Sequence, residues 1–230
     1  LTAGLIGTTG YSSKPFVVTY SPNGSNNFRS KSTLTSGSSA SARNVYFADM
    51  NNDGKPDLVV ANSNNTISIF PNQTTSSTGT ASFGSVVTLG TASGSVSAAL
   101  ALGDADSDGK LDVMAVFSGT NSVAFYPNTT ASAGATPSFA GIATFGTAAS
   151  PIAINMVDFD GDGNSDLVVA SNLATNNVSV LRNLGLVLGS LSFLAAQTFS
   201  AGTNPSGLAI GDIDGDGNVD IAVSNRSSNN

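Results

Sequence analysis

The sequence predicts an all-β fold built as a repeat array of four-stranded antiparallel units. Three observations carry this prediction. The 15 acidic residues are all Asp, and they lie in four nine-residue windows that start at Asp49, Asp104, Asp158 and Asp212, which are 55, 54 and 54 residues apart. Short β-branched and apolar segments flank each window, and Gly-, Asn- and Ser-rich turns separate them. No segment has a sustained helical periodicity.

Each repeat contains four candidate strands in the same order. The first leads into the Asp-rich window and the second leaves it, as in residues 99–102 and 113–116. A polar turn and an alternating third strand follow, for example 67–70. The fourth strand surrounds a periodic pair of apolar residues, such as Phe139 and Phe145, which we expect to pack between neighbouring units. Four antiparallel strands in a unit of about 40–55 residues are typical of a β-propeller blade.

The repeats predict one β-propeller-type region over residues 1–230, with about four blades' worth of strands and a partial blade at each end. The expected boundaries are a partial blade at 1–36, repeats at about 37–91, 92–147 and 148–201, and a partial blade at 202–230. From these ends we favour a native chain that continues beyond the sequence. The alternatives are a closed four-bladed ring, or strand completion between copies, in which head-to-tail self-association builds a filament.

Composition excludes several kinds of site. The chain has no Cys and no His, which excludes disulfides, thiolate and imidazole ligands and His-based acid–base chemistry. Glu is absent as well and every Asp lies in a window, so we expect no catalytic residues and no enzyme activity. The 8 Lys and Arg residues are scattered and predict no binding to nucleic acid. No apolar run is long enough to predict a membrane span.

The four windows, called loops 1 to 4 below, have the donor pattern of a calcium site. They read DMNNDGKPD, DADSDGKLD, DFDGDGNSD and DIDGDGNVD. Oxygens at positions 1, 3 and 5 converge when the loop curls, Gly at position 6 allows a sharp turn, position 7 offers its carbonyl, and the Asp at position 9 closes the shell in a bidentate manner. The predicted ligands of about four Ca²⁺ ions, one per loop, are Asp49, Asn51, Asp53, Lys55 and Asp57; Asp104, Asp106, Asp108, Lys110 and Asp112; Asp158, Asp160, Asp162, Asn164 and Asp166; Asp212, Asp214, Asp216, Asn218 and Asp220.

Bound cations explain the clustering better than turn chemistry does, because an empty loop would crowd three or four carboxylates together. Four Ca²⁺ ions would change the formal net charge from −7 to +1. Loop 1 is expected to bind most weakly, since Asn51 replaces an Asp. The alternatives are metal-free surface turns, Mg²⁺, which prefers a stiffer octahedral shell, and an EF-hand. The EF-hand is disfavoured because apolar residues stand where its Glu would lie: Val60, Ala115, Val169 and Val223.

The segment DFDGDGNSDLVVA, from Asp158 to Ala170, resembles the FG-GAP/VCBS-type repeat. This family includes the propeller of integrin α-subunits and many bacterial surface proteins. The resemblance covers the whole chain through four loop copies. It implies a β-propeller with calcium in the loop between the first and second strands of each blade, and its ligand positions transfer to the Asp residues named above. Propellers of the family commonly have seven blades, whereas this chain has material for about four.

On this basis we expect a secreted or cell-surface protein without enzymatic activity. Its expected role is a calcium-stabilised adhesion or binding module, or a structural subunit of a surface assembly or filament, with an extracellular protein or glycan as partner. The alternative is a lectin-like, carbohydrate-binding propeller, although Trp is absent and Tyr occurs only four times, whereas sugar sites usually use an aromatic platform. Catalysis is the weakest alternative. Six sequons occur, at Asn23, Asn64, Asn72, Asn128, Asn177 and Asn225. Asn23, Asn72 and Asn128 share one position in the turn after the third strand, and glycans on those exposed turns are a hypothesis. The alternative is that a chain rich in Asn, Ser and Thr contains sequons by chance.

Overall fold

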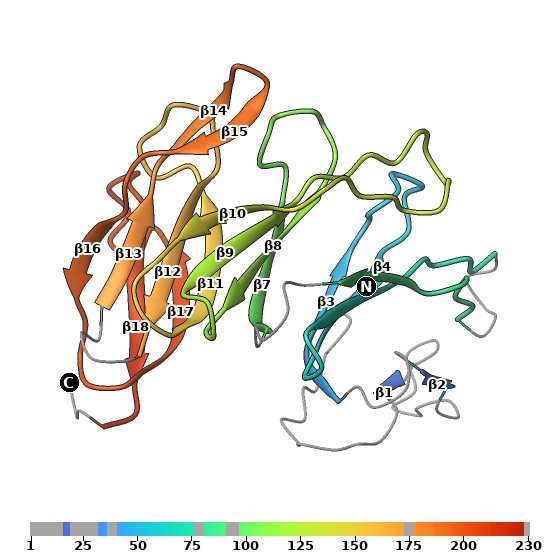
Figure 1. The fold of residues 1–230 in the computed structure, drawn as a ribbon, viewed down its shortest axis with the longest axis horizontal. Helices are drawn as coiled ribbons and strands as arrows, with labels where there is room; N and C mark the ends of the chain where they lie inside the picture. Colours follow the sequence, from blue (N-terminus) through green and yellow to red (C-terminus); the bar gives the residue numbers. More distant parts are fainter. Residues whose placement is uncertain are drawn as a thin grey trace.

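The computed structural model describes residues 16–18, 32–35, 41–75, 81–90, 97–172 and 177–227. These residues form 18 β-strands and no helix, which confirms the predicted all-β class. Consequently, no helix in the described part of the chain is long and apolar enough to cross a membrane. Three four-stranded antiparallel sheets stand in a row along the chain, with a two-stranded sheet at either end of the row (Figure 1).

In each four-stranded sheet the strands lie side by side in chain order, as a propeller blade requires. The first sheet consists of β3 (Ala42–Ala48), β4 (Asp57–Asn62), β5 (Thr66–Phe70) and β6 (Val87–Gly90). The second consists of β7 (Ser97–Gly103), β8 (Asp112–Phe117), β9 (Ser122–Tyr126) and β10 (Ala143–Gly146). The third consists of β11 (Pro151–Val157), β12 (Asp166–Ser171), β13 (Asn177–Leu181) and β16 (Gln197–Ser200).

Three smaller sheets complete the described fold. They are β1 (Phe16–Val18) with β2 (Ser32–Leu34), β14 (Asn183–Val187) with β15 (Ser190–Phe193), and β17 (Pro205–Gly211) with β18 (Asp220–Asn225). The pair β17–β18 repeats the first two strands of a blade, since its loop carries the fourth Asp-rich window. The expected strand at residues 1–7 and the periodic Phe28 lie outside the described residues.

The core lies between neighbouring sheets and follows from the two-residue alternation of the second strand of each blade. In β8, Val113 and Ala115 face the first sheet, and Met114 and Val116 face the third. All six residues of β8 are buried for this reason, as are all six of β4 and of β12. Burying one such Val or Met side chain contributes about 1.5–3 kcal/mol. The equivalent β18 has no buried residue, because no further sheet packs on its outer face in the described part of the chain.

Three of the periodic aromatic residues, Phe139, Phe145 and Phe193, pack between repeats as predicted, whereas Phe199 is 53% exposed. Phe145 on β10 of the second blade meets Phe193 on β15 of the third repeat edge to face, with ring centroids 4.7 Å apart. Phe139 packs against the apolar cluster between the first and second sheets. These contacts lie at the outer edge of the blades, so they add to the contacts made by the inner strands.

The connection between the third and fourth strands differs in the third repeat. In the first two repeats a single β-bridge closes it, Asn72–Phe83 and Asn128–Phe139. In the third repeat the same connection forms the hairpin β14–β15, which projects from the top of the molecule in Figure 1. Leu191 on β15 is buried, whereas five other apolar side chains on the hairpin or directly after it are at least 43% exposed: Leu184, Leu186, Val187, Leu188 and Leu194.

Candidate metal centres

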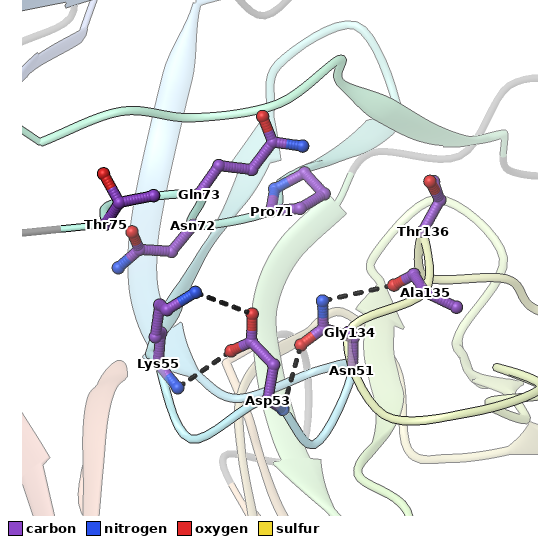
Figure 2. A pocket seen from close by; sticks show the side chains of 10 residues that line it. All are labelled: Asn51, Asp53, Lys55, Pro71, Asn72, Gln73, Thr75, Gly134, Ala135 and Thr136. Carbon is purple, nitrogen blue, oxygen red and sulfur yellow. Dashed lines mark hydrogen bonds and ion pairs between the residues drawn. The ribbon is translucent and has the colours of Figure 1, made fainter.

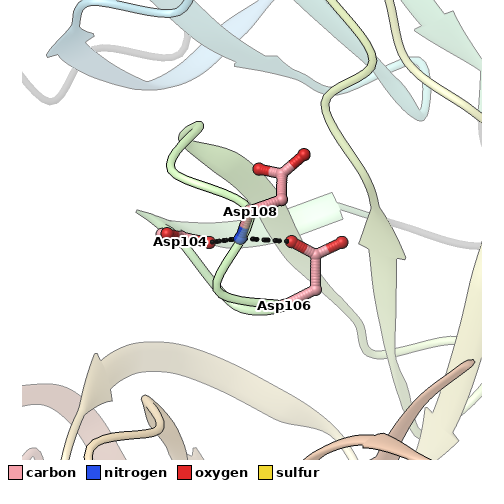
Figure 3. A group of neighbouring side chains, drawn as sticks. All are labelled: Asp104, Asp106 and Asp108. Atoms are coloured by element: carbon pink, nitrogen blue, oxygen red, sulfur yellow. Dashed lines mark hydrogen bonds between the residues drawn. The ribbon is translucent and has the colours of Figure 1, made fainter. Parts of the chain in front are cut away.

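Each of the four loops joins the first strand of a blade to the second, where the sequence placed it. All four share one internal hydrogen-bond pattern. The carboxylate at position 1 accepts the main-chain N–H groups of positions 5 and 6, so the loop curls around its first Asp. In loop 2, Asp108 N lies 3.0 Å from Asp104 Oδ1 (Figure 3). Gly109 N lies 2.9 Å from Asp104 Oδ2.

Positions 4 and 6 of each loop have positive φ, and the sequence analysis predicted this conformation for position 6. The Gly at position 6 has φ between 80° and 90° in all four loops, as predicted. Position 4 also has positive φ, with 54° at Asn52 and 62° at Ser107, and Gly161 and Gly215 stand at this position in loops 3 and 4. Position 4 is Asn or Gly in three of the loops, and both residues tolerate positive φ. This pattern could have predicted the conformation of position 4 as well.

The loops bring carboxylate oxygens within 4.8 Å of one another. In loop 2 the group is Asp104, Asp106 and Asp108, whose side chains are drawn in Figure 3. In loops 3 and 4 the groups join positions 1, 3 and 9 instead: Asp158, Asp160 and Asp166, and Asp212, Asp214 and Asp220. Loop 1 has no group of three acids among the described residues, because Asn51 occupies position 3. A donor set of carboxylate, amide and main-chain oxygens fits a hard divalent cation such as Ca²⁺.

The Asp at position 9 has a structural role that the sequence did not reveal. Asp57, Asp112 and Asp166 are fully buried. In loop 2, Asp112 Oδ2 accepts the N–H of Ala105 at 2.9 Å, and Asp112 Oδ1 accepts the N–H of Asn128 at 2.8 Å. Burial raises the pKa of Asp112 to about 6, and it raises the pKa of Asp57 and Asp166 as well. Each of these carboxylates thus ties its loop to the end of the third strand of its own blade.

Cationic side chains neutralise part of the negative charge of loops 1 to 3. Lys55 Nζ lies 3.4 Å from Asp53 Oδ2, and Lys110 Nζ lies 2.7 Å from Asp108 Oδ2. The latter hydrogen bond raises the pKa of Lys110. In loop 3, Arg182 pairs with Asp160. In loops 1, 2 and 4 the side chain at position 7 therefore contacts the carboxylate at position 5, although the sequence pattern indicated a role for the position 7 carbonyl alone.

Loop 1 is covered by a segment of the second repeat. Gly134 N donates to Asn51 O at 2.9 Å, and Asn51 Nδ2 donates to Ala135 O at 3.1 Å. Because the amide nitrogen of Asn51 faces this segment, its Oδ1 faces the loop and accepts the N–H of Asp53 at 3.3 Å (Figure 2). The two segments border a pocket of about 430 Å³ that also includes Lys55 and Pro71. Asn51 therefore points its oxygen to where the other loops have a carboxylate.

A second set of asparagines, one at the end of each third strand, belongs to the site. We call Asn72, Asn128 and Asn183 the linking asparagines. The main-chain N–H of each donates to the carboxylate at position 9 of its own blade, at 2.7, 2.8 and 2.7 Å. The side-chain amide of each donates to the carbonyl at position 8, at 2.9, 2.8 and 2.9 Å. The sequence pattern presented Asn72 and Asn128 as sequons and gave no sign of these contacts.

The expectation that Asn128 lies on an exposed turn is wrong, and the sequon residue Asn177 lies inside β13. Both are buried, and both hydrogens of the Asn128 amide are used in hydrogen bonds to main-chain carbonyls. Asn72 is half-buried, and its amide donates to Pro56 O. Asn64 lies exposed in the turn between β4 and β5, and Asn23 lies outside the described residues.

Comparison with known proteins agrees with the repeat seen in the sequence and the sheets. The FG-GAP-like repeat matches the chain four times, over residues 5–60, 49–115, 104–169 and 158–223. The last three matches each begin at the first Asp of a loop and end a few residues after the next loop. No curated protein matches the chain. The four matches together cover nearly the whole sequence, and the chain belongs to the FG-GAP-like repeat family.

Proposed function

We propose that this chain is a calcium-stabilised, propeller-like binding module that acts outside the cell. Repeats of the FG-GAP-like family suggest a propeller-like binding or adhesion module without enzymatic activity. The observation that carries the calcium assignment is the convergence of carboxylate oxygens within 4.8 Å in loops 2, 3 and 4. The partner we propose is an extracellular protein or a glycan.

The proposed ligands are the side chains at positions 1, 3, 5 and 9 and the carbonyl at position 7 of each loop. The Asp at position 9 can serve although its oxygens already accept N–H groups, because each carboxylate oxygen has two lone pairs. The cation would supply charge neutralisation and would fix the curl of the loop. The chain's own N–H groups hold the carboxylates of positions 1 and 9 in place, so their orientation does not depend on the ion.

The role we assign to the cation is structural. Each loop places several carboxylates close together at the junction of the two inner strands of a blade, and their mutual repulsion opposes this conformation. Lys55, Lys110 and Arg182 offset part of that repulsion, but exposed ion pairs typically contribute about 0–1 kcal/mol. Calcium sites of extracellular modules bind with dissociation constants of about 10⁻⁴–10⁻³ M, which suits the calcium concentration outside cells.

Equilibrium dialysis against ⁴⁵Ca²⁺ tests this proposal. The wild-type chain should bind about four ions, one per loop. The double variant Asp104→Asn with Asp108→Asn should bind one ion fewer, because it removes two of the charges of loop 2. The matched control is Asn64→Asp, which adds a carboxylate to an exposed turn away from the loops and should leave the stoichiometry unchanged. A wild-type chain that binds no calcium at millimolar concentrations would overturn the proposal.

A further inference from the structure

Asn128 joins two loops that belong to different blades. Its side-chain amide donates to Leu111 O of loop 2 at 2.8 Å and to Met50 O of loop 1 at 2.9 Å, which is 78 residues away in the chain. Its Oδ1 accepts the N–H of Thr130 at 3.0 Å. The side chain is 2% exposed, so all of its hydrogen-bonding groups are used inside the protein.

Asn183 repeats this arrangement one blade further along. Its side-chain amide donates to Ser165 O of loop 3 at 2.9 Å and to Ala105 O of loop 2 at 2.8 Å. Its main-chain N–H donates to Asp166 of loop 3 at 2.7 Å. Because Ala105 N in turn donates to Asp112, which accepts the N–H of Asn128, one continuous set of hydrogen bonds joins loops 1, 2 and 3.

Asn72 provides a contrast within the same molecule. It has the same two bonds to its own loop, from its N–H to Asp57 and from its amide to Pro56 O. Among the described residues, the side-chain amide of Asn72 donates no hydrogen bond to a carbonyl of another loop. It is half-buried, whereas Asn128 and Asn183 are buried. Among the bonds described, Asn72 therefore contacts only its own loop, whereas the other two linking asparagines contact two loops each.

The bridged carbonyl is at position 2, directly before a proposed ligand. In loop 1 the peptide group that contains Met50 O also contains the nitrogen of Asn51, and in loop 2 the peptide group that contains Ala105 O contains the nitrogen of Asp106. A peptide group is planar, so a hydrogen bond that fixes its oxygen also fixes the position of the next Cα. The linking asparagine of one blade thereby helps to place the third-position ligand of the blade before it.

We propose that Asn128 and Asn183 are positioning residues that couple neighbouring cation loops, so that occupation of one loop raises the affinity of the next. This inference rests on the proposed calcium function. A cation held by the carbonyl at position 7 and by Asp112 would fix the peptide group of Leu111 between them, and the oxygen of that group accepts from Asn128. Asn128 then holds the peptide group before Asn51 in its ligating position. Coupling of this kind is reciprocal, so loop 1 acts on loop 2 to the same extent.

Site-resolved NMR titration of the full chain with CaCl₂ tests the coupling. The amide of the Gly at position 6 donates to the first Asp of its own loop, at 2.7 Å in loop 1 and 2.9 Å in loop 2, so Gly54 and Gly109 report the state of these two loops. In the wild-type background, disabling loop 2 with Asp104→Asn and Asp108→Asn should weaken calcium binding at Gly54 by about fivefold or more. In the Asn128→Ala background the same change should have no effect at Gly54.

Asn72→Ala is the matched control, because it removes the bonds to loop 1 but leaves Asn128 in place. It should weaken binding at Gly54, and the response of Gly54 to the loop 2 double variant should persist.

Should Asn128→Ala fail to fold, the same cycle is run with Asn183→Ala, read at Gly109 while loop 3 is disabled. The inference would be overturned if disabling loop 2 left the calcium affinity at Gly54 unchanged. It would also be overturned if disabling loop 2 still lowered that affinity in the Asn128→Ala background. A wild-type chain whose glycine amides do not respond to calcium would overturn the proposed function itself.

Discussion

Asp112 and Asn128 are joined by a buried hydrogen bond of 2.8 Å between the main-chain N–H of Asn128 and Asp112 Oδ1. The other oxygen of Asp112 accepts the N–H of Ala105. This carboxylate therefore closes loop 2 and fastens it to the third strand of the same blade. The same arrangement recurs at Asp57 and Asp166.

Replacement of Asp112 by Ala should destabilise the fold even in the presence of a chelator. It leaves two buried N–H groups unpaired, each at a cost of about 1–3 kcal/mol, so we expect the free energy of unfolding to fall by about 2–6 kcal/mol. Asp220→Ala is the matched control, because Asp220 is half-buried and accepts one N–H, that of Ile213, among the bonds described. It should cost less than about 1 kcal/mol. Urea unfolding in EDTA measures both values, and equal losses would refute the role assigned to Asp112.

Leu188→Asn should stabilise the protein. Leu188 and Gly189 form the turn of the β14–β15 hairpin with φ of 53° and 79°, and the Leu188 side chain is fully exposed. Asn-Gly is the preferred pair for such a turn, whereas a branched apolar residue at positive φ is strained. We expect a gain of about 0.5–1 kcal/mol. Val187→Asn, one residue earlier in β14, is the control and should bring no gain. A lower urea midpoint for Leu188→Asn would contradict this account of the turn.

Alkaline pH should destabilise the protein partly through Tyr126. Burial raises the pKa of Tyr126 to about 12 from a usual value of 10.0. Between these values the unfolded tyrosine has lost its proton while the folded one keeps it, so the unfolded state binds fewer protons and stability falls as the pH rises. Below pH 10 the contribution of Tyr126 is intact.

Tyr126→Phe should remove this part of the pH dependence. We expect the difference in unfolding free energy between wild type and variant to change by about 1 kcal/mol between pH 9 and pH 11, in favour of the variant. The variant also loses the hydrogen bond to Gly90 O, but that loss is the same across the pH range below the pKa of Tyr126. Urea unfolding at several pH values measures the slope, and parallel curves would count against the burial effect.

The fold could be predicted because its signals are periodic. The windows starting at Asp49, Asp104, Asp158 and Asp212 set the repeat, and alternation in segments such as 113–116 identified the strands. The position of each loop between two strands and the positive φ at position 6 followed from the same pattern. These properties depend on residues that are close together in the chain.

The features that the sequence did not predict depend on contacts between distant residues. The hydrogen bond from Asn128 to Met50 O joins residues that are 78 positions apart. In the sequence, the residues next to Asn128 show only a sequon and do not indicate this bond. The hydrogen bond between Asp112 and Asn128 was not predicted, because an Asp that binds a cation and an Asp that accepts buried N–H groups cannot be told apart in a sequence. The hairpin β14–β15 was not predicted because the other two repeats have a polar connection between their third and fourth strands.

The central claim is that divalent cations in the Asp-rich loops hold the blades in shape, and a thermal melt with and without calcium tests it most directly. Four sites with the affinity of extracellular modules should raise the midpoint by at least about 10 °C in 10 mM CaCl₂ relative to EDTA. An equal concentration of MgCl₂ should raise it less, because Mg²⁺ gives up its water reluctantly. A midpoint that is the same with calcium and with EDTA would contradict the claim.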